Sequence, residues 1–181
     1  GPNCKVFTEE FKEIKPGSGE SGMIAVTGFL PIGYYKDLEK TEKTFKVLDG
    51  ERYSIPGDWV RVEDDGSLTL LGRGSNCINT AGEKVYPEEV EEALKFHDAV
   101  ADALVVGVKD AKWGQSITAV VQLNENSFVD ELELKEFSRK HLAAYKLPKK
   151  ILIKDDLNRA PNGKADYKSI QQYAERHLGI K

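Results

Sequence analysis

The segment NRAPNGKADY, residues 158–167, sets Lys164 directly after a glycine in a run of turn-forming residues. Proline stiffens the backbone on one side of this turn, and glycine frees it on the other. A lysine on such a turn can offer a point charge to a phosphate or carboxylate where negative charge develops in a reaction. A solvated turn lysine is the alternative, and this segment alone leaves both interpretations open.

Two other residues have side chains that suit a nucleotide. Asp58 follows Gly57 at the entry to an expected strand, where its carboxylate could accept hydrogen bonds from the vicinal hydroxyls of a ribose. A turn-capping aspartate is the plainer alternative. Arg73 lies between Gly72 and Gly74, and it could bind a nucleotide or pair with a surface acid.

Several kinds of site are excluded by what the sequence lacks. Gly163 and Lys164 are followed by alanine and have no upstream glycine at the required spacing, so they are not a Walker-type phosphate loop. No GxSxG nucleophile elbow occurs, and the three histidines form no catalytic constellation. No cysteine and histidine cluster has zinc spacing, so no metal site is predicted.

The composition is that of a soluble globular protein, with 181 residues, 40% hydrophobic and 31% charged. A net charge of −4 argues against non-specific binding to nucleic acid. Two cysteines and no apolar run of about 18 residues predict a reducing, cytoplasmic location without a transmembrane segment. The leading Gly1-Pro2, without methionine, is interpreted as a scar left by cleavage of an expression tag.

The first part of the chain has the pattern of an antiparallel β meander. Short β segments fill residues 21–71, and the pairs Asp49-Gly50 and Asp65-Gly66 are typical of tight hairpin turns. From Gly72 a polar, glycine-containing connection follows, with only scattered apolar residues. We therefore predict a domain boundary there.

The second part alternates strands and helices. Pro87, followed by two glutamates, predicts a helix start. Apolar runs at 99–108, 116–123 and 150–153 predict strands, residues 130–145 predict an amphipathic helix, and a last helix is expected from about Tyr167. The predicted fold class is α+β: a small C-terminal domain with a central sheet flanked by helices, preceded by an antiparallel β remnant. The expected divisions are 1–72, a linker at 73–76, and 77–181.

Five segments in order along the chain resemble motifs of the adenylate-forming superfamily of acyl-CoA synthetases, peptide-synthetase adenylation domains and luciferases. They are GESGMIAVTGFLPIGYYKDLEKTEKTF, YSIPGDWV, GRGSNCINTAGEKVYPEEVE, YKLP and APNGKADY. Each motif alone is weak, but five at compatible spacing are hard to obtain by chance. The variants GRGSNCIN and GKADY favour bacterial fatty-acyl or related acyl-CoA ligases.

The resemblance implies a two-step reaction in one active site. A fatty acid carboxylate attacks the α-phosphate of ATP, bound with Mg²⁺, to give acyl-adenylate and pyrophosphate, and the thiol of CoA then displaces AMP. Lys164 corresponds to the family's lysine that bridges the carboxylate and α-phosphate oxygens in the first step. Asp58 and Arg73 correspond to residues that bind the ribose.

The resemblance also implies residues for the second step. Gly82, with Ala81 beside it, matches the loop that the pantetheine arm of CoA passes, and Lys84 stands where the family often has an arginine facing the phosphates. Family members rotate the small domain between the two steps about a hinge residue, usually Asp or Lys. Ser75 occupies the hinge position here, and Asn79 stands where the pattern often has lysine.

The resemblance covers about the final third of such an enzyme: residues 1–72 correspond to the end of the large domain, and 77–181 to the C-terminal lid. The phosphate loop and acyl pocket lie upstream in the family, so the isolated chain is predicted to be inactive. The alternative is a non-catalytic module of the same fold that binds CoA or another protein. The exposed edge of the β remnant is expected to pair with a second copy. A full-length ligase of this kind could also associate peripherally with a membrane.

Overall fold

A computed structural model describes residues 3–180. By its internal contacts the chain divides into two compact units, Gly1–Ser75 and Asn76–Lys181, and each is described by itself. This division lies within the segment 73–76. No helix among the described residues has the length and apolar character needed to cross a membrane.

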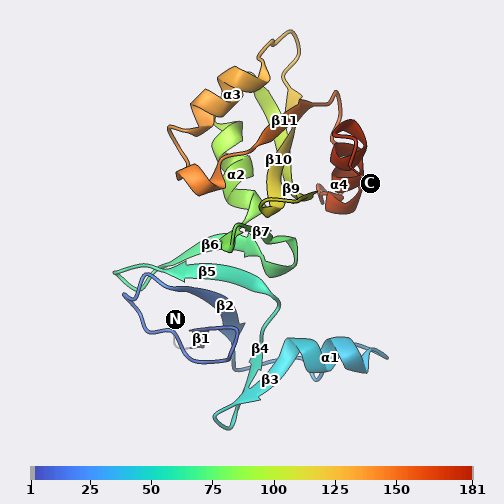
Figure 1. The fold of residues 1–181 in the computed structure, drawn as a ribbon. Coiled ribbons are helices and arrows are strands. Elements are labelled where there is room, and N and C mark those ends of the chain that lie inside the picture. Colours follow the sequence, from blue (N-terminus) through green and yellow to red (C-terminus); the bar gives the residue numbers. More distant parts are fainter. Residues whose placement is uncertain (1–2, 181) are drawn as a thin grey trace. The chain divides into compact units, whose positions relative to one another are not determined.

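The first unit is built on one antiparallel sheet. Its strands are β1 (Cys4–Phe7), β2 (Ser21–Val26), β3 (Phe45–Leu48), β4 (Glu51–Ser54), β5 (Asp58–Val62) and β6 (Leu68–Arg73). The strand order is β3-β4-β2-β5-β6, and β1 pairs with β2 (Figure 1). A short helix that was not predicted, α1 (Leu38–Thr44), precedes β3.

Both predicted hairpin turns are present in this sheet. Asp49 and Gly50 have φ values of 50° and 81° and join β3 to β4. Asp65 and Gly66 lie between β5 and β6, where the Asp65 carboxylate accepts a hydrogen bond from the Ser67 amide. The buried side chains form two small clusters, around Val60 and around Tyr53.

The second unit is a five-stranded sheet with helices on both faces. Its strands are β7 (Ile78–Thr80), β8 (Glu83–Val85), β9 (Val100–Asp110), β10 (Gly114–Leu123) and β11 (Lys150–Ile153), and its helices are α2 (Pro87–Lys95), α3 (Glu131–Ser138) and α4 (Tyr167–His177). β10 pairs antiparallel with β9 and β7 and parallel with β11. A 3-10 turn covers Ala144–Lys146, and another, Gly74–Asn76, lies at the division between the two units.

Alternation along β9 explains why helices cover both faces. Ala103 and Val105 are fully buried in the core that includes Val90 and Leu94 of α2 and Leu134 of α3. Their neighbours on the strand point to the other face, into the core formed with α4. Figure 1 shows α2 and α3 on one side of this sheet and α4 on the other. The predicted α+β fold, with a central sheet flanked by helices, is confirmed.

Two local predictions in this unit are wrong. The helix predicted over 130–145 ends at Ser138, whose hydroxyl donates to the Leu134 carbonyl at 2.7 Å, and the chain continues in turns. Leu142 is still buried, so the apolar spacing persists where the helix does not. The polar connection contains the β7–β8 hairpin, whose three-residue strands are too short to give a period.

Candidate functional site

Asp58 and Arg73, the two predicted ribose contacts, lie together in the first unit. They are direct partners in the β5–β6 ladder, and Arg73 Nε is 3.0 Å from Asp58 Oδ1. The side chains are 31% and 60% exposed, respectively, so both present polar atoms to solvent. The strands thus hold one acceptor and one donor group side by side, an arrangement that suits the hydroxyls of a sugar.

Ala81 and Gly82 form the turn of the β7–β8 hairpin in the second unit. Both have left-handed backbone conformations, with φ of 52° and 86°. An added Cβ at Gly82 would meet nothing within 4 Å, so the space over this turn is open. The Ala81 amide donates to the Trp113 carbonyl at 2.9 Å, which fixes the turn beside the β9–β10 connection. Lys84 is exposed on β8.

Ser75 lies in the 3-10 turn at the division between the units. The preceding Gly74 packs closely, since an added Cβ would come 2.6 Å from the Trp59 indole nitrogen. The amide of Gly74 also donates to the Gly57 carbonyl at 3.0 Å. The backbone is therefore held firmly just before Ser75.

Lys164 ends a turn that is closed by its own backbone. The Ala160 amide donates to the Lys164 carbonyl at 2.9 Å, and the Gly163 amide donates to the Ala160 carbonyl at 2.8 Å. The Lys164 amide donates to Asn162 Oδ1 at 3.2 Å, while its side chain is exposed. No hydrogen-bond or ion-pair partner of its ammonium group occurs within residues 3–180, so the charge is available to a ligand.

A charged pair ties this turn to β9. Arg159 makes two hydrogen bonds to Asp102 of β9, from Nε at 2.6 Å and from Nη2 at 3.0 Å. Its Nη1 donates to the Gly163 carbonyl at 3.2 Å. Burial acts to raise the pKa of Asp102, but the hydrogen bonds from Arg159 and the Ala103 amide outweigh it, and the pKa stays below its usual range.

Glu91 of α2 makes a second connection, around the edge of the sheet. This side chain is only 5% exposed; it accepts a hydrogen bond from the Val105 amide of β9 at 2.9 Å and another from the Tyr167 hydroxyl at 3.2 Å. Burial raises the pKa of Glu91 to about 7 against these two hydrogen bonds. Tyr167 begins α4, three residues after Lys164, so the turn is held at both of its ends.

The two turns lie at opposite ends of β9. Asp102, which holds the Lys164 turn through Arg159, is near the first residue of the strand, whereas Trp113, which holds the Ala81-Gly82 turn, follows its last residue. Asp110 lies eight positions after Asp102 on this extended strand, which corresponds to roughly 25 Å. We refer to these regions as the Lys164 end and the Gly82 end.

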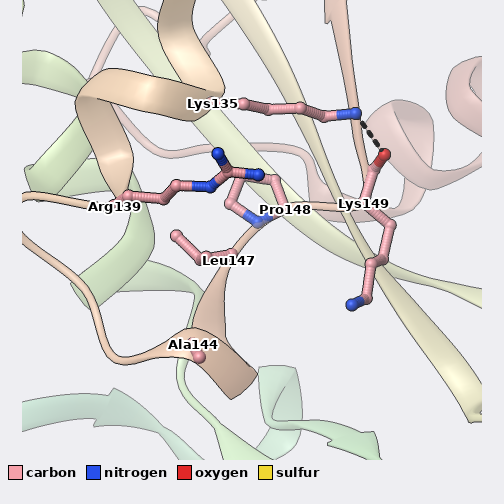
Figure 2. Close-up of a pocket in the computed structure, with 6 residues that line it drawn as sticks. All are labelled: Lys135, Arg139, Ala144, Leu147, Pro148 and Lys149. Carbon is pink, nitrogen blue, oxygen red and sulfur yellow. Dashed lines mark hydrogen bonds between the residues drawn. The ribbon is translucent and has the colours of Figure 1, made fainter. Parts of the chain in front are cut away.

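A pocket of ≈ 200 Å³ that sequence reasoning missed has three cationic side chains on its wall. It is lined by Lys135, Arg139, Ala144, Leu147, Pro148 and Lys149 (Figure 2). Lys135 already donates to Glu131 at 2.7 Å and to the Lys149 carbonyl at 2.6 Å. The exposed Arg139 guanidinium has no partner side chain among the described residues. Its planar fork suits a phosphate or carboxylate.

The pocket and the Gly82 end are linked through Trp113. The Lys149 ammonium lies 5.3 Å from the centre of the Trp113 ring, and the backbone of the same tryptophan holds Ala81. The Lys149 amide donates to Ile117 of β10, near the end of β10 that pairs with β7. Basic residues near YKLP are visible in the sequence, but their convergence depends on packing between α3 and β11.

Comparison with known proteins gives the family. Residues 89–164 match the AMP-binding enzyme C-terminal domain. Residues 89–164 therefore belong to the family of AMP-binding enzyme C-terminal domains. The match begins in α2 and ends at Lys164, so it includes both carboxylates that hold the Lys164 turn. The resemblance to adenylate-forming acyl-CoA synthetases is confirmed by relatives over the rest of the chain.

Two relatives of the chain are acyl-CoA ligases by name. It is 50% identical over 170 residues to a medium/long-chain-fatty-acid–CoA/3-oxocholest-4-en-26-oate–CoA ligase of Mycobacterium tuberculosis, covering 94% of this chain and 31% of the relative. It is 53% identical over 174 residues to a 3-oxocholest-4-en-26-oate–CoA ligase of Rhodococcus rhodochrous, covering 93% and 31%. The chain thus spans about a third of the length of these relatives.

Solved structures agree with this family. The o-succinylbenzoate CoA synthetase of Bacillus subtilis, in complex with its acyl-adenylate intermediate, matches with a TM-score of 0.82 and 32% identity over 93% of this chain and 34% of that one. ATP-bound MatB from Rhodopseudomonas palustris matches with a TM-score of 0.81 and 32% identity, over 97% and 34%.

Proposed function

We propose that the chain is the C-terminal part of an ATP-dependent acyl-CoA synthetase, an acid-thiol ligase that forms acyl-CoA, AMP and pyrophosphate. Two relatives are named as CoA ligases of fatty or steroid carboxylates. These names support an apolar carboxylic acid as the substrate. The observation that carries the proposal is the separation of Lys164 and Gly82 to opposite ends of β9. Two turns so far apart suit two successive steps at one active site.

Lys164 acts in the first step. A carboxylate oxygen of the acid attacks the α-phosphorus of ATP, and the bond from that phosphorus to the pyrophosphate oxygen breaks. Negative charge gathers on the oxygens around phosphorus in the transition state, and the ammonium group of Lys164 stabilises it there. An exposed lysine on a closed turn suits this role because the turn can approach a bound ligand without rearranging.

Asp58 and Arg73 bind the ribose of ATP and of the adenylate. The Asp58 carboxylate accepts hydrogen bonds from the two ribose hydroxyls, and Arg73 donates to one of their oxygens. Mg²⁺ is proposed to enter as the complex with ATP, where it would neutralise phosphate charge.

The Gly82 end acts in the second step. The thiol sulfur of CoA attacks the acyl carbon, and the bond to the AMP oxygen breaks. The open space over Ala81 and Gly82 accommodates the pantetheine arm. The cations of the nearby pocket, Arg139 and Lys149, together with Lys84 on the same hairpin, bind the phosphates of CoA.

The second unit rotates between the steps about Ser75, so that each end of β9 meets the active site in turn. A hinge needs a residue that can change φ and ψ while its neighbours stay packed. Ser75 suits this because Gly74 before it is fixed against Trp59 and Gly57.

The proposed cellular location of the full-length protein is the cytoplasm, where ATP and CoA are available. A peripheral membrane association would suit a fatty acid substrate.

Lys164→Ala in the full-length protein tests the first role. Acyl-adenylate formation from fatty acid and ATP is expected to fall by about 10²–10³-fold, the range for loss of one electrostatic stabiliser. Lys168→Ala, which removes an exposed lysine one turn away, is the matched control. Normal adenylate formation in Lys164→Ala would refute the proposed role.

The isolated 181-residue chain is expected to release no pyrophosphate from ATP with fatty acid. If the chain is instead a non-catalytic module, it should bind CoA or a protein tightly. In that case Lys164→Ala should not change the rate of acyl-CoA formation in the full-length protein. Turnover by the isolated chain would contradict its assignment as a lid.

A further inference from the structure

We propose that Arg159, held by Asp102, and Tyr167, held by Glu91, are positioning residues that fix the Lys164 turn to the edge of β9. This inference rests on the proposed role of Lys164 in adenylate formation. We refer to these four residues as the clamp. No clamp residue was singled out by motif or spacing, because Asp102 and Arg159 are 57 residues apart in the sequence and Glu91 and Tyr167 are 76 apart.

The clamp begins at the outer amides of β9. Within the described residues β9 pairs with β10 alone, so alternate amides of β9 face away from the sheet. Ala103 donates to Asp102 Oδ1 at 2.9 Å and Val105 to Glu91 Oε1 at 2.9 Å. Each outward amide thus fixes one carboxylate, and an edge that could pair with another chain is closed.

Each carboxylate then binds one flank of the Lys164 turn. Arg159 precedes the turn and Tyr167 follows it, and both contact their carboxylate with a hydrogen bond. Arg159 also contacts the turn itself. Its third nitrogen, Nη1, donates to the Gly163 carbonyl, which belongs to the peptide group between Gly163 and Lys164. One guanidinium therefore connects β9 directly to the backbone of the lysine.

The geometry favours arginine over lysine at position 159. Its fork makes two hydrogen bonds to one carboxylate and keeps another donor for the carbonyl, whereas lysine has a single nitrogen. With 32% of the Arg159 side chain and 21% of the Asp102 side chain exposed, the pair lies at the surface. A pair with two hydrogen bonds to one carboxylate can also contribute to folding, so stability is measured beside both half-reactions.

Both half-reactions of the full-length enzyme test the clamp. Arg159→Ala is expected to slow acyl-adenylate formation about 10-fold, since small displacements of a catalytic group cost one to two orders of magnitude. Conversion of supplied acyl-adenylate and CoA to acyl-CoA should stay unchanged, because it uses the Gly82 end. Arg159→Lys should recover part of the loss. Arg176→Ala is the matched control, since that arginine donates from Nε to its own helix at Gln172.

The double variant Arg159→Ala/Lys164→Ala separates positioning from other roles. If Arg159 acts only by placing Lys164, the double variant should form acyl-adenylate no more slowly than Lys164→Ala alone. A further 10-fold loss in the double variant would overturn the inference. Equal loss of both half-reactions in Arg159→Ala, with a lower unfolding temperature, would also overturn it by indicating a general structural role.

Tyr167→Phe tests the second arm of the clamp. It removes the hydroxyl and keeps the ring, so about a 3-fold loss of adenylate formation alone is expected, the equivalent of one weak hydrogen bond. No change in this variant would overturn the proposed role of Tyr167 and Glu91. An unaffected Lys164→Ala enzyme would instead refute the proposed function, whatever Arg159→Ala does.

Discussion

The two ends of β9 hold their turns by different means. At the Gly82 end the hairpin is fixed through its backbone, by the hydrogen bond from Ala81 to Trp113 and by two left-handed residues. At the Lys164 end the turn is fixed through side chains, by the carboxylates of Asp102 and Glu91. The difference follows from what each turn offers: open space needs no side chain, whereas a charge must be held at a defined point.

Gly82→Leu places a side chain on the open turn at the Gly82 end. An added Cβ at this position meets nothing within 4 Å, so the expected cost to folding is about 1–2 kcal/mol for a left-handed residue with a Cβ. The leucine side chain would fill the space proposed for pantetheine. Conversion of acyl-adenylate to acyl-CoA is expected to fall about 100-fold while adenylate formation is kept.

Stopped-flow measurement of the two half-reactions in the full-length protein checks this prediction. Asn79→Ala, in the same hairpin but away from the turn, is the control. Loss of adenylate formation in Gly82→Leu would argue that the two ends of β9 do not serve separate steps.

Glu91→Gln tests the buried carboxylate that holds the Lys164 end. Because burial raises the pKa of Glu91 from 4.5 to about 7, the folded state binds this proton more tightly than the unfolded state. The contribution of the Glu91 carboxyl group to the free energy of unfolding is therefore complete at low pH and is lost as pH rises from about 4.5 to 7. The shift corresponds to about 3 kcal/mol in the free energy of unfolding.

Urea unfolding of the wild-type and Glu91→Gln chains from pH 4.5 to 8 provides the test, with Trp113 fluorescence in a Trp59→Phe background as the signal. Glutamine does not ionise, so the variant should gain stability relative to the wild type by the amount above as pH rises. Parallel pH curves for the two chains would contradict the raised pKa of Glu91.

Arg139→Ala probes the cationic pocket beside the Gly82 end. Loss of one hydrogen bond to a charged group, about 1.5–3 kcal/mol, is expected to raise the KM for CoA about 10-fold or more with adenylate formation intact. Lys140→Ala removes the neighbouring exposed charge and is the control. An unchanged KM for CoA would remove this pocket from the binding site.

Several elements of both units could be predicted from sequence. Pro87 with two glutamates marked the start of α2, the turn at Asp49-Gly50 is set by local φ preferences, and the α4 start at Tyr167 was expected. These features depend on residues a few positions apart, so local rules are enough.

The features that could not be predicted from sequence depend on contacts between distant residues. The β7–β8 hairpin is stabilised by pairing with β10 and by Trp113, about 30 residues later, and the end of α3 at Ser138 was hidden because Leu142 keeps the helical spacing. The clamp joins residues 57 and 76 positions apart. Lys164, Asp58 and Arg73 were found through motifs, but the pairing of Asp58 with Arg73 required the ladder between β5 and β6.

Arg73→Ala gives the smallest expected effect on folding. The pair with Asp58 is largely exposed at the arginine, so its loss should change the free energy of unfolding of the isolated chain by less than about 1 kcal/mol. Binding of ATP to the full-length protein should weaken, which isothermal titration calorimetry would measure. A large loss of stability would show that Arg73 serves the sheet and not a ligand.

The most direct test of two separate ends is the ratio of the two half-reaction rates in Lys164→Ala and in Gly82→Leu, measured side by side in the full-length protein. We predict that the lysine variant loses adenylate formation and that the glycine variant loses thioester formation. Two variants that slow both half-reactions by the same factor would contradict it.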